Sequence, residues 1–206
     1  MNETEKVFFN VEQTLKTAEF GLNELQGDQP ERKLAGLRNL AVFGRAVTNV
    51  LQKLRSIEPT FDKWYSKYVA EMKNDPLLKY FYKMRSEILK EGFLRTTSSL
   101  YIREFNSSTD MERIGIPPPN AKSVFMGDQI GGVGWIVELP DGTEEKYYGT
   151  LPSDIGKLTM FFPESPKKHL EENLGKETID ELGQLYFTYL KNMVDSAKQQ
   201  FIKKKI

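Results

Sequence analysis

The chain has no cysteine, a single histidine and no long apolar run, and each of these shortages excludes a class of protein. Without cysteine, the 206 residues form neither disulfide bonds nor thiolate zinc sites, and thiol catalysis is excluded. The one histidine, His169, excludes metal sites built from several imidazoles and most histidine-centred triads. No apolar stretch reaches the ~20 residues of a membrane-spanning helix, and the N-terminus lacks the features of a signal peptide. We therefore expect a cytoplasmic protein without membrane association.

Neither sign of charge is in excess, because 29 Lys and Arg residues balance 29 Asp and Glu residues. This balance argues against a general nucleic-acid coat or a binder of anionic membranes, but it leaves a local basic groove open. Hydrophobic residues make up 39% of the chain, which is enough to bury a core without metal or disulfides. The length fits one domain, or one domain with an elaboration.

Apolar residues recur at helical spacing through residues 1–95. Their steps of three and four predict two long helices followed by two shorter ones. Asp75 and Pro76 are typical of a helix start, with the aspartate as cap and the proline in the first turn, and Gly92 is a good helix end. Gly44 lies on the apolar stripe of the second helix, which predicts the close approach of another helix.

The pattern changes to alternation near residue 96, and the turn at 140–143 predicts a β-hairpin, so residues 96–162 are predicted to form a small antiparallel sheet. Residues 163–206 return to helix, with Thr178 as its cap. We therefore predict an α+β fold. It is mainly an α-helical up-and-down bundle, made of residues 1–95 and the C-terminal helix, with the β-sheet as an insertion. An appended sheet with the last helix packed on it is the alternative.

Four stretches within residues 39–92 carry a resemblance to a known family. They are Phe43-Gly44-Arg45-Ala46-Val47, Phe61 with Trp64-Tyr65, Asp75-Pro76-Leu77, and Met84-Arg85-Ser86-Glu87-Ile88-Leu89-Lys90-Glu91-Gly92. In them the chain resembles a bacterial branch of the HEPN superfamily (higher eukaryotes and prokaryotes nucleotide-binding). The resemblance implies a helix bundle that forms homodimers. In active members it implies metal-independent RNA cleavage by an Arg-Asn-x-x-x-His motif.

The chain departs from that motif at the positions that catalyse RNA cleavage in active members. Arg85 matches the arginine, but Ser86 stands where asparagine is common and Lys90 stands in place of the histidine. The family histidine handles the proton of the attacking 2′-hydroxyl, whereas a lysine with its ordinary pKa of about 10.4 is a poor base at neutral pH. The resemblance therefore implies a non-catalytic binding or interaction protein, in a bacterial stress or defence system.

Two other functions stay open at this point. In a divergent ribonuclease, Arg85 would stabilise the phosphorane charge while Lys90, Glu87 or His169 moved the proton. In a structural adaptor, residues 96–162 would dock a partner protein.

Arg45, Asn49, Arg85 and Lys90 form the predicted binding site. Arg45 and Asn49 lie four residues apart on one helix face, and together with Arg85 they would grip a phosphate through planar donors. An interhelical salt bridge, to Glu87 or Asp62, explains Arg45 and Asn49 equally well. Around Arg85 and Lys90, ordinary local pairs of Glu87 and Glu91 with Lys83 and Lys90 are the simpler explanation. The candidate ligands are RNA and a nucleotide, and we expect no cofactor and no metal.

Three further features have simpler explanations. His169 stands among charged neighbours and is predicted to lie on the surface. The glycine-rich run at 131–134 lacks the Lys-Ser/Thr ending of a phosphate loop and precedes a strand, so we expect a flexible approach to the hairpin. The aromatic cluster of residues 64–82 has the chemistry to stack on bases, but its apolar members are predicted to be core and its edge tyrosines to suit an interface.

Overall fold

The computed structural model of the protein describes residues 2–128 and 132–202. It divides into a helical unit and a β unit, which are taken separately below. The helical unit comprises Met1–Gln26, Ala35–Leu94 and Ser165–Ile206, and the β unit comprises Gly27–Leu34 and Arg95–Glu164. The predicted α+β class, mainly helical with small antiparallel sheets, is confirmed.

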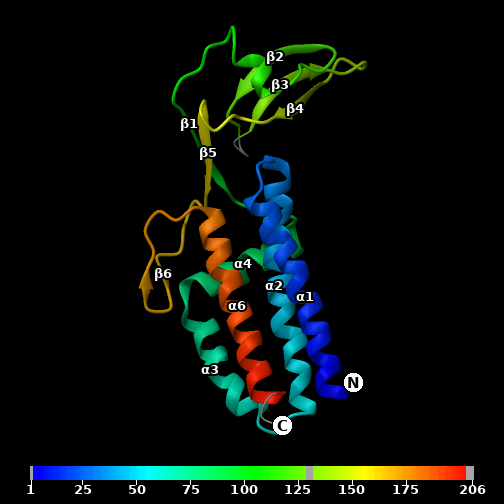
Figure 1. Cartoon of the computed structure of the whole chain (residues 1–206), viewed down its shortest axis with the longest axis vertical. Coiled ribbons are helices and arrows are strands. Elements are labelled where there is room, and N and C mark those ends of the chain that lie inside the picture. The colour runs from blue at the N-terminus through cyan, green and yellow to red at the C-terminus, as the bar shows by residue number, and fades with distance from the viewer. Residues whose placement is uncertain (1, 129–131, 203–206) are drawn as a thin grey trace. The chain divides into compact units, whose positions relative to one another are not determined.

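Long helices at the predicted places form most of the helical unit (Figure 1). They are α1 (Glu3–Gln26), α2 (Pro30–Leu51), the short 3-10 helix η1 (Gln52–Ser56), α3 (Phe61–Asn74), α4 (Pro76–Glu91) and α6 (Ile179–Phe201). α1 and α6 run antiparallel, because Glu12 bonds Lys198 at one end while Gln26 bonds Gln184 at the other. No helix in residues 2–128 and 132–202 is both long and apolar enough to cross a membrane.

Glycines mark the closest helix contacts of the unit. A Cβ added to Gly36 would lie 2.5 Å from the carbonyl oxygen of Gly21 and 2.5 Å from the amide nitrogen of Leu25, so α1 and α2 meet backbone to backbone. A Cβ added to Gly44 would lie 2.6 Å from the ring of Tyr186 on α6. The close approach predicted at Gly44 is therefore confirmed.

The predicted helix ends are confirmed as well. The Asp75 side chain accepts a hydrogen bond from the amide of Leu78 at 2.8 Å, and Gly92 ends α4 with a left-handed φ of 66°. Thr178 and Glu181 form a reciprocal capping box at the start of α6. These local bonds satisfy amide groups that have no partner within a helix.

The predicted surface position of His169 is wrong. Residues 168–173 form a small hairpin of β6 (Lys168–His169) and β7 (Glu172–Asn173), and His169 is 6% exposed. Its Nδ1 lies 3.2 Å from both carboxylate oxygens of Asp75, and the amide of Leu170 donates to the same carboxylate at 2.6 Å. The burial was not predictable from local sequence, because the partner stands more than ninety residues earlier.

The β unit contains two antiparallel sheets where the sequence predicted one. β1 (Thr97–Ile102) pairs with β5 (Gly156–Phe161), and a separate sheet has the order β2-β3-β4, with the short helix α5 (Met111–Ile114) before it. The strands of that sheet are β2 (Ala121–Met126), β3 (Val133–Glu138) and β4 (Glu144–Gly149). The hairpin predicted around 140–143 is confirmed between β3 and β4, and the core centres on Ile114, Val133 and Trp135. Gly131 of the glycine-rich run lies outside the described residues.

Asp128, just after β2, links the start of β3 to β4 through hydrogen bonds. Its carboxylate accepts hydrogen bonds from Lys146 Nζ at 2.8 Å, from the Tyr148 hydroxyl at 2.7 Å and from the amide of Gly132 at 3.0 Å. Partial burial alone would raise the pKa of Asp128, but the bonds from Lys146, Tyr148 and Gly132 lower it to about 2. The carboxylate therefore stays charged well into the acid range.

This low pKa predicts how the β unit responds to acid. Because the pKa of folded Asp128 lies below the ordinary 3.8, its stabilising contribution is complete above about pH 4 and is lost as the pH falls toward 2. We expect Asp128→Asn to lower the stability of the β unit at pH 7 and this deficit to shrink between pH 4 and pH 2. In a Trp64→Phe background, the fluorescence of Trp135 follows the unfolding of the β unit and measures its stability. Glu112→Gln, at an exposed position, is the control. A deficit that did not change with pH would contradict the prediction.

Candidate functional site

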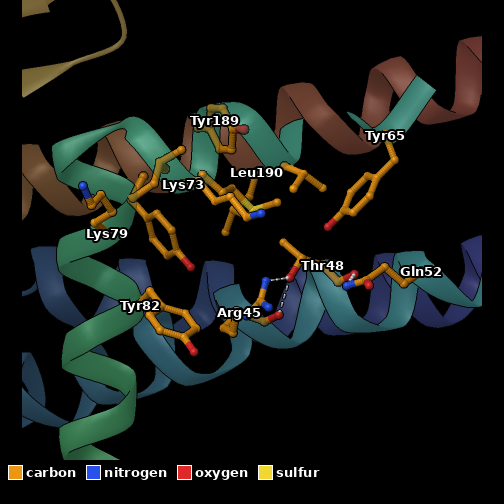
Figure 2. A pocket seen from close by; sticks show the side chains of 13 residues that line it. Arg45, Thr48, Gln52, Tyr65, Lys73, Lys79, Tyr82, Tyr189 and Leu190 are labelled. Atoms are coloured by element: carbon orange, nitrogen blue, oxygen red, sulfur yellow. Dashed lines mark hydrogen bonds between the residues drawn. The ribbon is translucent and has the colours of Figure 1, made fainter. Parts of the chain in front are cut away.

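A pocket opens in the helical unit among α2, η1, α3, α4 and α6 (Figure 2). Its volume is about 490 Å³, within the ~300–1,000 Å³ typical of small-molecule sites. Two chemical groups of side chains make its walls. The apolar ones are Val69, Met72, Leu78 and Leu190, and the aromatic ones are Tyr65, Tyr82, Tyr186 and Tyr189.

The aromatic wall is fixed by packing on both sides. The Tyr186 ring stacks on Phe81 with centroids 4.1 Å apart and an interplanar angle of 6°. On its other side the missing side chain of Gly44 leaves room for the ring. Tyr82, by contrast, is 56% exposed and stands at the rim. Tyr186 is thus a rigid part of the wall, and Tyr82 offers the accessible aromatic surface for a flat ligand.

The buried phenols of this wall stay neutral at physiological pH. Burial raises the pKa of Tyr186, and nearby Arg45 only partly opposes this. Burial also raises the pKa of Tyr189, as does the hydrogen bond that its hydroxyl donates to Glu71 at 2.9 Å. Burial likewise raises the pKa of Tyr65, against the opposing effects of the Arg45 charge and the Thr48 side chain. These groups are therefore hydrogen-bonding and stacking partners, not proton acceptors.

Arg45, Lys73 and Lys79 give the pocket its charge. The Arg45 guanidinium donates to Thr48 Oγ1 and lies 5.6 Å from the ring centroid of Tyr82. Within the described part of the chain, none of the three cations forms an ion pair, and no Asp or Glu lines the pocket. Such a set of unpaired positive charges beside an aromatic wall favours an anionic ligand that carries a ring.

The break between α3 and α4 brings the two lysines together. Lys73 lies in the last turn of α3 and Lys79 in the first turns of α4, on either side of the Asp75–Pro76 junction. Both side chains therefore reach the same rim, and Figure 2 shows them on the side of Tyr82. Thr48, Gln52 and Tyr65 stand at the opposite side, so the pocket has a cationic end and a neutral polar end.

Of the four residues predicted for the binding site, the structure places Arg45 in the pocket wall. Asn49 follows one turn later on α2, exposed and outside the lining. Arg85 and Lys90 lie on α4, also outside the lining. The Arg85 Nε is buried and has no hydrogen-bond partner among the described residues, whereas Lys90 is exposed. Nor do the described residues hold any cluster of three or more His, Asp or Glu side chains suited to a metal.

The sequence missed most of the pocket. Lys73 and Lys79 carry no motif that marks them in the sequence, although they flank a helix break that places both at one corner. Tyr186 and Tyr189 lie on the apolar stripe of the last helix, which predicts core, and both are buried, but a buried phenol also needs a partner for its hydroxyl. Tyrosines on an otherwise apolar stripe were the available signal.

Comparison with known families gives a match of residues 28–123 to the family described as Bacteriophage lambda protein ea47. The matched segment is somewhat less than half of the 206 residues. It includes Arg45, Lys73 and Lys79, while the tyrosines of α6 lie beyond it. Neither the curated proteins nor the solved structures give a match to the chain.

Proposed function

We propose that the protein is a non-catalytic, HEPN-like binding protein whose pocket takes a nucleotide. In this proposal the helical unit is an up-and-down bundle that carries residues 96–162 as an insertion. The observation that carries it is a set of three cations that form no ion pair with the described residues and stand beside four tyrosines. Guanidinium and ammonium groups bind phosphate, and tyrosine faces stack on bases.

The pocket chemistry favours binding over cleavage. A ribonuclease needs a group near the phosphate that accepts the 2′-hydroxyl proton. Along the described lining stand neutral phenols, two lysines and Arg45, and His169 is bonded to Asp75 instead. The match to a phage family supports a setting in which phage and bacterium meet. Homodimerisation, RNA as a ligand and a partner protein docking on the β unit stay predictions.

Isothermal titration with AMP, GMP, CMP, UMP and ribose 5-phosphate tests this function. We expect at least one nucleotide to bind, and Arg45→Gln to weaken it ~10- to 100-fold, because a charge-assisted hydrogen bond is lost. Replacing Lys73 or Lys79 with glutamine should weaken binding less, since both side chains are exposed.

Asn49→Ala is the matched control, one turn from Arg45 and outside the pocket lining. It should leave nucleotide affinity unchanged. Failure of every phosphate ligand to bind, or equal weakening by Arg45→Gln and Asn49→Ala, would overturn the proposal. Cleavage of a labelled RNA that disappears in Arg85→Ala would overturn its non-catalytic part.

A further inference from the structure

The neutral end of the pocket carries a buried hydroxyl that forms no hydrogen bond of ordinary geometry with the described residues, and Thr48 is the neutral polar side chain that influences its pKa. Tyr65 is 3% exposed, and its hydroxyl has no hydrogen-bond partner within the residues that the structure describes. Figure 2 shows this hydroxyl directed across the pocket toward Thr48. Buried polar groups in folded proteins are nearly always hydrogen-bonded, so an unsatisfied one in a pocket wall points to an atom of a ligand.

Packing prevents the Tyr65 hydroxyl from turning away to water. Its ring stacks on Phe61 with centroids 5.0 Å apart and an interplanar angle of 21°. Trp64 and Tyr68 of the same helix also lie against it, with ring centroids 6.1 Å and 6.4 Å away. The phenol is therefore held in place before any ligand arrives, which lowers the entropic cost of using it.

The neighbouring polar groups leave one further acceptor free. Thr48 Oγ1 is used twice, since it accepts from Arg45 Nη1 at 2.5 Å and donates to the Arg45 carbonyl at 2.9 Å. The Gln52 amide nitrogen donates to the Thr48 carbonyl at 3.1 Å, and its side-chain oxygen accepts no hydrogen bond from the residues that the structure describes. The neutral end thus offers a phenol hydroxyl, both donor and acceptor, and one amide oxygen, an acceptor.

We infer that Tyr65 and Gln52 recognise the base of the nucleotide through an edge that carries a donor next to an acceptor. The inference rests on the proposed function, in which Lys73 and Lys79 at the cationic end, together with Arg45 between the two ends, hold the phosphate. The Tyr65 hydroxyl donates to the acceptor of the base, and the Gln52 oxygen accepts from its donor. All four common bases have such an edge, so the site selects for a base, not for a sugar phosphate alone.

Comparing nucleotides with ribose 5-phosphate, which has no base, tests the inference in the full chain. We expect Tyr65→Phe to weaken the best-bound of AMP, GMP, CMP and UMP ~5- to 10-fold, the effect of one hydrogen bond. The affinity for ribose 5-phosphate should not change. Thermal unfolding should show an unchanged or raised midpoint, because the lost hydroxyl had no partner in the free protein. Tyr68→Phe, on the same helix and outside the lining, is the matched control.

The outcomes separate the two proposals. If Arg45→Gln weakens nucleotide binding but Tyr65→Phe does not, the base-recognition role is wrong and phosphate binding at the cationic end stands. If Tyr65→Phe weakens ribose 5-phosphate as much as the nucleotide, Tyr65 acts on the pocket as a whole and the inference fails. If neither nucleotides nor ribose 5-phosphate bind, both proposals fail.

Discussion

Replacing Gly36 with alanine should lower the free energy of unfolding of the helical unit by ~3 kcal/mol. The new Cβ would lie 2.5 Å from the Gly21 carbonyl oxygen and 2.5 Å from the Leu25 amide nitrogen, both backbone atoms of α1. Neither atom moves unless the helix moves, so α1 and α2 must separate and lose packing along their contact. Urea unfolding followed by circular dichroism at 222 nm measures this, because almost all helical residues lie in this unit.

The sign of the effect makes Gly36→Ala a sharp test. In an exposed helix interior the same substitution stabilises by ~1 kcal/mol, since alanine has the higher helix propensity. Gly183→Ala is the matched control within α6. Its Cβ would meet side-chain carbons, Leu25 Cδ2 at 2.8 Å and Leu40 Cδ2 at 3.1 Å, which can shift, so a smaller loss is expected. A Gly36→Ala protein more stable than wild type would rule out the backbone contact of α1 with α2.

These glycines show how far the sequence predicts the fold. Gly44 was predictable as a contact because it interrupts an apolar stripe at helical spacing. The meeting of Gly21 and Gly36 was not, since it depends on the register in which α1 and α2 cross. The sheets follow the same logic. The hairpin of β3 and β4 was readable from its turn, whereas β1 pairs with β5, more than fifty residues later, through contacts that no local pattern specifies.

The candidate site was less predictable than the fold. Arg45 was found because it borders an apolar stripe, where a polar residue either pairs or binds. Arg85 and Lys90 were predicted from a motif. A motif fixes the spacing of residues along α4 but not which face of the helix lines the pocket, and both residues lie outside the lining. The unsatisfied hydroxyl of Tyr65 is a property of three-dimensional packing, because it depends on where α3 places the ring against Thr48 of α2, whose Oγ1 already bonds Arg45. Of the predicted site residues, Arg45 is thus the one that the sequence placed correctly in the pocket lining.

Asp75→Ala is expected to cost about as much stability as Gly36→Ala, ~3–4 kcal/mol. The buried carboxylate accepts from the amide of Leu78 at 2.8 Å, accepts from the amide of Leu170 at 2.6 Å and lies 3.2 Å from His169 Nδ1. Its loss removes the cap of α4 and leaves His169 and the Leu170 amide without their partner. Urea unfolding followed by circular dichroism at 222 nm measures the free energy of unfolding. Asp62→Ala is the control, because Asp62 forms an exposed pair with Arg55 and should change little.

The same substitution connects stability to binding, because two pocket walls depend on this carboxylate. Leu78 is held by the cap itself, and Tyr189 packs edge-on against His169 with ring centroids 6.0 Å apart. We therefore expect Asp75→Ala to weaken nucleotide binding although Asp75 does not line the pocket. Hydrogen exchange should show faster exchange in residues 168–174 and in the first turn of α4. Exchange in these two segments as slow as in wild type would show that Asp75 does not hold the β6–β7 hairpin against the start of α4.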